Sequence, residues 1–191
     1  KNDIINKHLL KDYVSKFNNS DNELYKQHID NKNAYSFLLK NIPIIELPDK
    51  VIEEKYYFRW WTYRKHIKST SDGFVITEFL PKVYWAKKHN TINCPAAHHI
   101  YEGRWLRDPK YISEYIDFWL KNSEDGKRQY SFWIADATLA FNKIHRNDSL
   151  LFTQLHPLIS NYNEWEKIRK DNNKLLFWQW DEKDGMEFTV S

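Results

Sequence analysis

The segment whose residue types are best suited to chemistry is an acidic loop that follows two tryptophans. In LLFWQWDEKDGMEFTVS, Glu187 follows a Gly-Met pair and lies close in sequence to Trp178 and Trp180. A carboxyl group held against aromatic rings has its ionised form disfavoured, so its pKa rises. Such a group can act as the general acid that protonates a departing glycosidic oxygen. The spacing makes Glu187 a candidate general acid beside two aromatic rings that could stack on a sugar. The alternative is an ordinary solvated acidic loop.

A second candidate segment, NTINCPAAHHIYEGRWLRD, carries two adjacent histidines. Pro95 predicts a helix start, which places His98 and His99 in a first turn whose free N–H groups favour a polar or anionic ligand. Glu102 lies one turn further on. Adjacent residues cannot both face a metal from one helix, and the segment lacks HExxH spacing. A buried, hydrogen-bonded histidine is the alternative for at least one of the pair.

Two further segments place aromatic and charged residues on one helical face. In QYSFWIADATLA, Tyr130, Trp133 and Asp136 are spaced by three, which stacks two rings and a carboxylate. In EEKYYFRWWTYRKHI, Trp60 and Arg64 lie on neighbouring turns. Core packing is the alternative for both sets, because aromatic stripes at helical spacing are mostly buried.

The composition of the chain argues against several classes of protein. The chain has 191 residues, of which 17% are aromatic and only 41% hydrophobic, with nine Trp. Its net charge of +3 is spread along the chain, so it has no basic tract suited to nucleic acid. One cysteine, Cys94, excludes an internal disulfide framework and a cysteine-based zinc cluster. The sequence shows no apolar stretch of the roughly 20 residues that a membrane span needs, and it suggests no cofactor.

The expected fold class is all-α. Glycine is scarce, with four residues, and turn signals are far apart, which favours helices joined by loops. Residues 1–18 carry a helical apolar stripe, and residues 21–40 repeat it more loosely before the extended connector IPIIELP. A helix is expected over about residues 50–68 with Asp49 as its N-cap, since acids lie in its first turn and bases near its end.

The rest of the chain predicts four more helices. SDGFVITEFLPKVYW indicates a turn with a short extended piece, and a helix follows Pro95. In DPKYISEYIDFWLKN, Asp108 is the expected N-cap and Pro109 the first helical residue. YSFWIADATLAFNKIH and DSLLFTQLHPLISNYNEWEKIRKD predict two more helices, the second bent or interrupted at Pro157. The closing LLFWQW is strand-like.

Five segments, taken in order, carry a resemblance to a known family. They are YYFRWWTYRKHI, DGFVITEFLPKV, TINCPAAHHIYEGRWLRDP, YSFWIADA and FWQWDEKDGMEFTVS. Over about residues 45–191 the chain resembles bacterial glycoside hydrolases of the mannosylglycerate-hydrolase-like group, which are related to trehalases and glycoside hydrolase family 63. A closer similarity to family 142 is an alternative. Residues 1–40 lie outside the resemblance.

The resemblance implies an (α/α)6 toroid, in which helical hairpins surround a funnel that binds sugar. It also implies hydrolysis with inversion, by two carboxylates separated by roughly 6.5–9.5 Å so that a water molecule fits between base and sugar. The general acid of related enzymes follows a Gly-Met pair, a position held here by Glu187. The residues that would contact substrate are Trp60, Arg64, His98, His99, Glu102, Trp133, Asp136 and Trp180.

The sequence departs from the family in length. A complete toroid has about twice the helices predicted here, and the general base comes from the C-terminal half. We therefore expect residues 1–45 to form an N-terminal helical extension and residues 46–191 to form the N-terminal part of an inverting glycoside hydrolase, an incomplete toroid.

Its expected partners are an oligosaccharide or glycoside, and either the missing C-terminal half or a second copy of the chain. The enzyme class suggests an extracellular or periplasmic location. The alternatives are a non-catalytic carbohydrate-binding helical module and a decayed or truncated enzyme.

Overall fold

The computed structural model describes residues 7–146, 148–180 and 183. These residues form seven α-helices and two short hairpins, which confirms the all-α class and agrees with an incomplete toroid of paired helices. The helices are α1 (Lys7–Asn19), α2 (Asn31–Asn41), α3 (Lys50–His66), α4 (Ala96–Gly103), α5 (Lys110–Asp117), α6 (Ile134–His145) and α7 (Asp148–Arg169). The hairpins pair β1 (Ile67–Thr70) with β2 (Gly73–Ile76), and β3 (Lys170–Asp171) with β4 (Leu176–Phe177).

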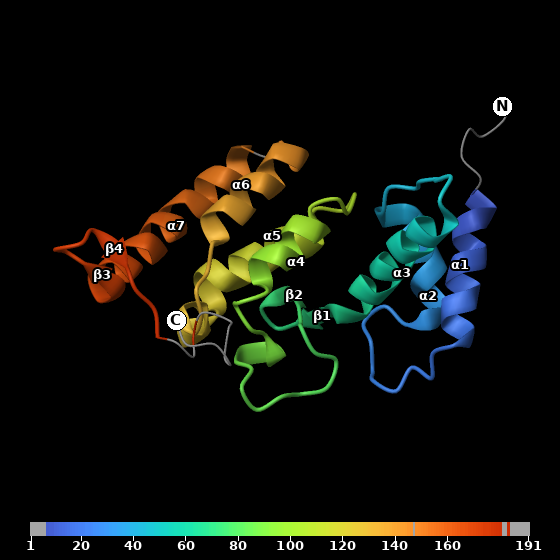
Figure 1. Ribbon diagram of the computed structural model, residues 1–191, viewed down its shortest axis with the longest axis horizontal. Helices are drawn as coiled ribbons and strands as arrows, with labels where there is room; N and C mark the ends of the chain where they lie inside the picture. The colour runs from blue at the N-terminus through green and yellow to red at the C-terminus, as the bar shows by residue number, and fades with distance from the viewer. Residues whose placement is uncertain (1–6, 147, 181–182, 184–191) are drawn as a thin grey trace.

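The described part of the molecule is elongated, and its elements follow one another along the long axis (Figure 1). Helices α1, α2 and α3 form one end, in blue and teal, while α7 and the β3–β4 hairpin form the other, in orange and red. The β1–β2 hairpin, α4 and α5 lie between them. In the described residues, no helix is both long enough and apolar enough to span a membrane.

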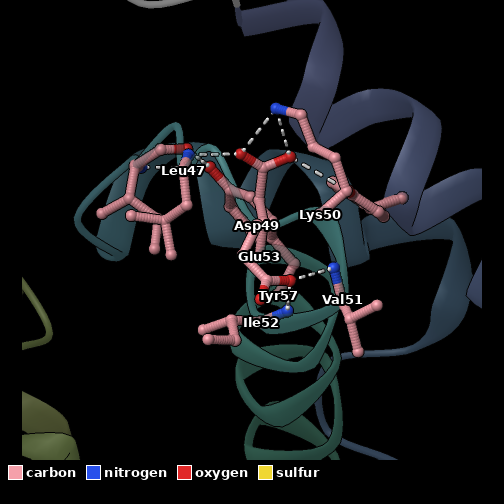
Figure 2. A network of polar contacts seen from close by, with 9 residues as sticks. Leu47, Asp49, Lys50, Val51, Ile52, Glu53 and Tyr57 are labelled. Atoms are coloured by element: carbon pink, nitrogen blue, oxygen red, sulfur yellow. Dashed lines mark hydrogen bonds and ion pairs between the residues drawn. The ribbon is translucent and has the colours of Figure 1, made fainter.

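Helix α3 begins where the sequence predicts. Asp49 is its N-cap, and one carboxylate oxygen accepts hydrogen bonds from the backbone N–H groups of Val51 (2.9 Å) and Ile52 (3.1 Å), as Figure 2 shows. These bonds satisfy two of the donors that a helix N-terminus leaves unpaired. The helix ends at His66, two residues before the expected end, because the chain turns there into strand β1.

A buried carboxylate ties the start of α3 to its surroundings. Glu53 is fully buried and accepts hydrogen bonds from the Leu47 N–H (2.6 Å), the Tyr13 hydroxyl (3.0 Å) and the Lys50 ammonium (3.2 Å). Figure 2 shows its contacts with Leu47 and Lys50. Burial alone would raise the pKa of Glu53, but these donors outweigh it and hold the pKa below its ordinary value. The side chain is therefore an ionised structural link.

The N-terminal helices pack on α3. Lys16 of α1 pairs with Glu54 at 2.8 Å, and the Trp61 indole N–H donates to Asn18 at 2.8 Å. A single apolar core contains residues from Leu10 to Phe141, so it spans the expected boundary between residues 45 and 46. The division of the chain at that point stays a prediction.

The β1–β2 hairpin connects α3 to α5. It pairs Ile67 with Ile76 and Thr70 with Gly73, as expected for the extended piece after the turn. Gly73 has a φ of 97° and lies against α5, where a Cβ would come within 2.8 Å of a Glu114 carboxylate oxygen. That carboxylate also accepts the Phe74 N–H at 2.8 Å, which fastens β2 to the helix. Position 73 therefore requires glycine.

Three local expectations differ from the structure. Residues 21–30 are irregular, so the looser stripe of residues 21–40 is helical only from Asn31. Helix α5 begins at Lys110, so Pro109 immediately precedes it; the Asp108 carboxylate still accepts the Lys110 N–H at 3.0 Å, as a capping residue would. Helix α7 runs through Pro157 without interruption. Proline has no backbone N–H, so the Thr153 carbonyl loses its helical donor. The loss is tolerated because Thr153 is exposed.

Candidate functional site

A polar cleft of about 280 Å³ lies where the end of α3, strand β2 and the start of α4 meet. Its lining residues come from segments that are distant in sequence and are mostly polar or ionisable. They are Arg59, Tyr63, His66, Ile76, Thr77, Glu78, Pro95, His98 and His99. The β1–β2 hairpin creates the cleft, because it returns the chain antiparallel to β1 and brings Thr77 beside His66.

An ion pair lies beside this cleft. The Arg59 guanidinium contacts a Glu102 carboxylate oxygen at 2.6 Å and joins α3 to α4. Burial raises the pKa of Glu102, and the charge of Arg59 offsets part of that rise. Arg59 itself is largely exposed, so the pair presents both a donor and an acceptor group at the surface.

The half-buried His99 is held in its neutral form. Desolvation, aided by the nearby His66 and Arg59, lowers the pKa of His99 to about 3. Its Nδ1 lies 3.4 Å from the Tyr115 hydroxyl, and its backbone carbonyl accepts the Tyr63 hydroxyl at 2.7 Å. At neutral pH the cleft therefore contains an uncharged imidazole fixed by two tyrosines.

His66 is the second imidazole of the cleft. Its Nδ1 lies 2.7 Å from the Thr77 carbonyl oxygen. Because a carbonyl can only accept, Nδ1 carries the proton and Nε2 is an acceptor in the neutral ring. Burial lowers the pKa of His66, which favours this neutral form.

An exposed aromatic platform adjoins the histidines. The Trp133 ring, at 39% exposure, lies edge-on to His98 with ring centroids 4.9 Å apart and next to Tyr101 at 5.3 Å. The Tyr101 hydroxyl donates to Asp136 at 2.5 Å, and this hydrogen bond raises the pKa of Tyr101. The Arg104 guanidinium lies over the Tyr101 ring, 4.3 Å from its centroid. Exposed rings bordered by hydrogen-bonding groups suit stacking on a sugar.

The structure thus brings together five of the predicted site residues, on α4 and at the start of α6: His98, His99, Glu102, Trp133 and Asp136. It does not bring Trp60 or Arg64 to them. Trp60 is buried against Tyr63, and Arg64 is fully buried on the other side of α3, where it donates to Gln27 (2.8 Å) and the Ile29 carbonyl (2.6 Å). A substrate contact for these two residues stays a prediction.

The remaining predicted residues lie near the end of the chain. Trp180 follows β4, is 59% exposed and lies edge-on to Trp178 with ring centroids 5.1 Å apart. It lines a separate cavity of about 370 Å³ with Lys87, Arg128, Gln129, Arg169 and Lys183. Glu187 lies outside the described residues.

Sequence reasoning missed Arg59, Tyr63 and His66. These residues are spaced by four and three along α3, which places them on one face of the helix, and that spacing was available as a signal. Tyr101 was also missed, although it lies one turn from His98. In residues 7–146, 148–180 and 183, no three potential metal-binding side chains gather into a cluster.

Comparison with known proteins relates this geometry to enzymes. Residues 88–191 match the family described as the mannosylglycerate hydrolase MGH1-like glycoside hydrolase domain. A solved structure titled "Sialidase" is similar over 96% of this chain, with 38% sequence identity and a TM-score of 0.90. The chain spans only 17% of the length of that protein. No curated protein matches the chain in sequence.

The extent of these similarities bears on the site. The family match contains the histidines, Glu102 and the Trp133 platform. The structural similarity at 96% coverage also reaches into residues 1–40, which the sequence resemblance did not include. The N-terminal helices and the elements that form the cleft are therefore both covered by the similarity to that structure.

Proposed function

Because the chain belongs to the mannosylglycerate hydrolase MGH1-like glycoside hydrolase family, we propose that its cleft between α3, β2 and α4 binds a glycoside for hydrolysis. The observation that carries this proposal is the ion pair of Arg59 and Glu102 beside a neutral His99 and an exposed Trp133. Family membership supports the glycosidase-related role, and the cleft supports the choice of binding site.

The polar and aromatic groups in and beside the cleft match the chemistry of a sugar. A carboxylate accepts hydroxyl protons, a guanidinium donates to hydroxyl oxygens, and a neutral imidazole can do either. Glu102, Arg59 and the two neutral histidines supply these groups, while the Trp133 ring offers a face to the C–H side of a pyranose. Arg59 neutralises Glu102, so we assign Glu102 a binding role rather than that of a general base.

We assign the general acid to Glu187. The assignment is supported by its place after the Gly-Met pair of DGME, which resembles the motif of related enzymes. An inverting reaction would pair it with a carboxylate roughly 6.5–9.5 Å away that activates water. The acid donates its proton to the departing glycosidic oxygen, and the base takes a proton from the attacking water. The rest of the toroid, or a second chain, would supply that base.

The test of the catalytic role is Glu187→Gln in the native protein, with Glu182→Gln in the same segment as the matched control. Release of reducing sugar from a panel of methyl glycosides measures turnover, because the methoxide leaving group needs a proton from the general acid, and circular dichroism checks the fold. We expect Glu187→Gln to reduce turnover roughly 100-fold or more and the control to retain it. Equal activity of the two variants would remove Glu187 from the mechanism.

A second candidate function is non-catalytic carbohydrate binding. The ion-paired state of Glu102 favours it, because a carboxylate held by arginine suits hydrogen bonding better than proton transfer. In that case a methyl glycoside would change the tryptophan fluorescence of the chain, but no glycoside of the panel would be hydrolysed. A decayed enzyme would show neither property.

A further inference from the structure

Another cavity, distinct from the cleft and from the cavity at Trp180, lies between the start of α6, the middle of α7 and strand β4. Its volume is about 360 Å³, which is sufficient for a single sugar ring. Five aromatic residues line it: Phe132, Tyr162, Trp165, Phe177 and Trp178. Three of these rings, Tyr162, Phe177 and Trp178, are between 41% and 52% exposed, so the cavity is open to solvent.

This cavity is also lined by buried polar atoms that have no hydrogen-bond partner among the described residues. Asn161 is only 7% exposed, and its Oδ1 is an unpaired acceptor. The Trp165 indole Nε1 and the Gln179 Nε2 are unpaired donors in the same lining. Buried polar groups are nearly always hydrogen-bonded, so three such atoms around one opening indicate an external partner.

The wall itself is held in place. The Trp178 N–H donates to the Arg169 carbonyl at 2.9 Å, and the Arg169 guanidinium lies over the Trp178 ring, 4.4 Å from its centroid. The β3–β4 hairpin thus fixes Trp178 against the end of α7. A wall with a fixed position can select a flat, rigid ligand, because little side-chain entropy is lost on binding.

We propose that this α6–α7 pocket is a second glycan subsite that binds one pyranose ring. The inference rests on the proposed function, since it extends the glycoside contacts beyond the cleft. A pyranose offers an apolar face for Trp178 and Tyr162, hydroxyl protons for the Asn161 Oδ1, and hydroxyl oxygens for the Trp165 and Gln179 donors. A purely apolar ligand would leave all three polar atoms unpaired.

The experiment follows the indole N–H signals of the isotope-labelled 191-residue chain by NMR. Methyl α-D-mannopyranoside and methyl α-D-glucopyranoside are the probes, and 2-naphthol is the aromatic comparison. The Trp165 and Trp133 signals are assigned from their loss in Trp165→Phe and Trp133→Phe. We expect at least one sugar to shift the Trp165 signal to saturation, because the indole N–H gains an acceptor.

Asn161→Leu removes the buried acceptor and keeps a similar volume, while Asn163→Leu makes the same change at an exposed position of the same helix. We expect Asn161→Leu to raise the sugar Kd roughly tenfold or more and Asn163→Leu to leave it unchanged. If Asn161→Leu does not fold, Trp165→Phe replaces it, because this variant removes the indole donor. Calorimetry then compares its sugar Kd with that of the parent chain, and we again expect weaker binding.

The outcomes separate this subsite from the proposed function. A shift of Trp133 without Trp165 would keep the cleft and overturn the subsite. A Trp165 shift in this chain, together with no hydrolysis of any glycoside by the native protein of the turnover test, would keep the subsite and overturn the hydrolase. A response to 2-naphthol but to neither sugar, or equal sugar affinity in both asparagine variants, would overturn the subsite.

Discussion

At the scale of single residues, the ion pair of Arg59 and Glu102 connects two helices at the edge of the cleft. Its carboxylate is partly buried, and burial raises the pKa of Glu102 against the opposing charge of Arg59. The pair is therefore sensitive to any ligand that completes or replaces its contacts. A sugar hydroxyl that donates to Glu102 would favour the ionised carboxylate further.

Glu102→Gln tests this contact. The substitution keeps the shape of the side chain but removes the charge, and we expect it to weaken glycoside binding roughly tenfold, since a hydrogen bond to a charged group contributes about 1.5–3 kcal/mol. A fluorescence titration with a methyl glycoside measures the Kd. Glu54→Gln on the surface of α3 is the control. Unchanged affinity in Glu102→Gln would exclude the carboxylate from binding.

His99 predicts how stability depends on pH. Its pKa is about 3 in the folded chain, below the ordinary value of 6.5, so the unfolded chain binds a proton more readily. The contribution of neutral His99 to the free energy of unfolding is fully present above about pH 6.5. It is lost as the pH falls toward 3, by up to about 1.4 kcal/mol per pH unit. Urea midpoints measured between pH 7 and pH 4 should therefore decrease.

The matched variants for this prediction are His99→Gln and His98→Gln. The first removes the neutral imidazole beside Tyr115, and the second changes an exposed neighbour. We expect His99→Gln to flatten the pH dependence over this range and His98→Gln to leave it as in the parent chain. The same slope in both variants would contradict the assignment to His99.

At the scale of elements, α3 both supports the fold and lines the cleft. Its first turn is fixed by the Asp49 cap and the buried Glu53, while its last two turns present Arg59, Tyr63 and His66. The position of these cleft residues therefore depends on where the helix starts. An anchored start also fixes the register of the residues that follow.

Asp49→Ala should lower the free energy of unfolding by about 1 kcal/mol, because two backbone N–H groups lose their acceptor. Urea denaturation followed by circular dichroism measures the loss. Asp12→Ala, at an exposed position within α1, is the control and should change stability by less than about 0.5 kcal/mol. A loss at Asp12 as large as that at Asp49 would argue against the capping role.

At the scale of the whole molecule, the N-terminal helices and the rest of the chain share one core. Asn18 pairs with Trp61, and the loop before α2 surrounds the buried Arg64 guanidinium. Removing these partners would leave a buried charge without acceptors, which is strongly destabilising. Residues 1–45 and residues 46–191 are thus expected to unfold together.

Two probes of denaturation test this expectation. Tryptophan fluorescence and far-ultraviolet circular dichroism should give coincident urea transitions for the full chain. A chain limited to residues 46–191 should lose the cooperative transition, because α3 would expose the face that α1 covers. A cooperative transition in the shortened chain would show that residues 46–191 fold alone.

The sequence predicted those features that depend on neighbours along the chain. Asp49 as a cap, the helix after Pro95 and the helical stripe within residues 1–18 follow from local hydrogen bonding and spacing, and the structure contains each. The grouping of His98, His99 and Glu102 also follows from the pitch of one helix. The family resemblance came from such local motifs, and the match over residues 88–191 confirms it.

Only the tertiary structure decided which faces meet. Trp60, Arg64 and Arg59 all lie on α3, but α3 is buried on several sides, so helical spacing cannot choose the side that meets the cleft. The structure places Arg64 against residues 27–31 and Arg59 beside Glu102, a pairing across 43 positions in sequence. Contacts over such separations depend on how helices pack together, and no local pattern along the chain records that packing.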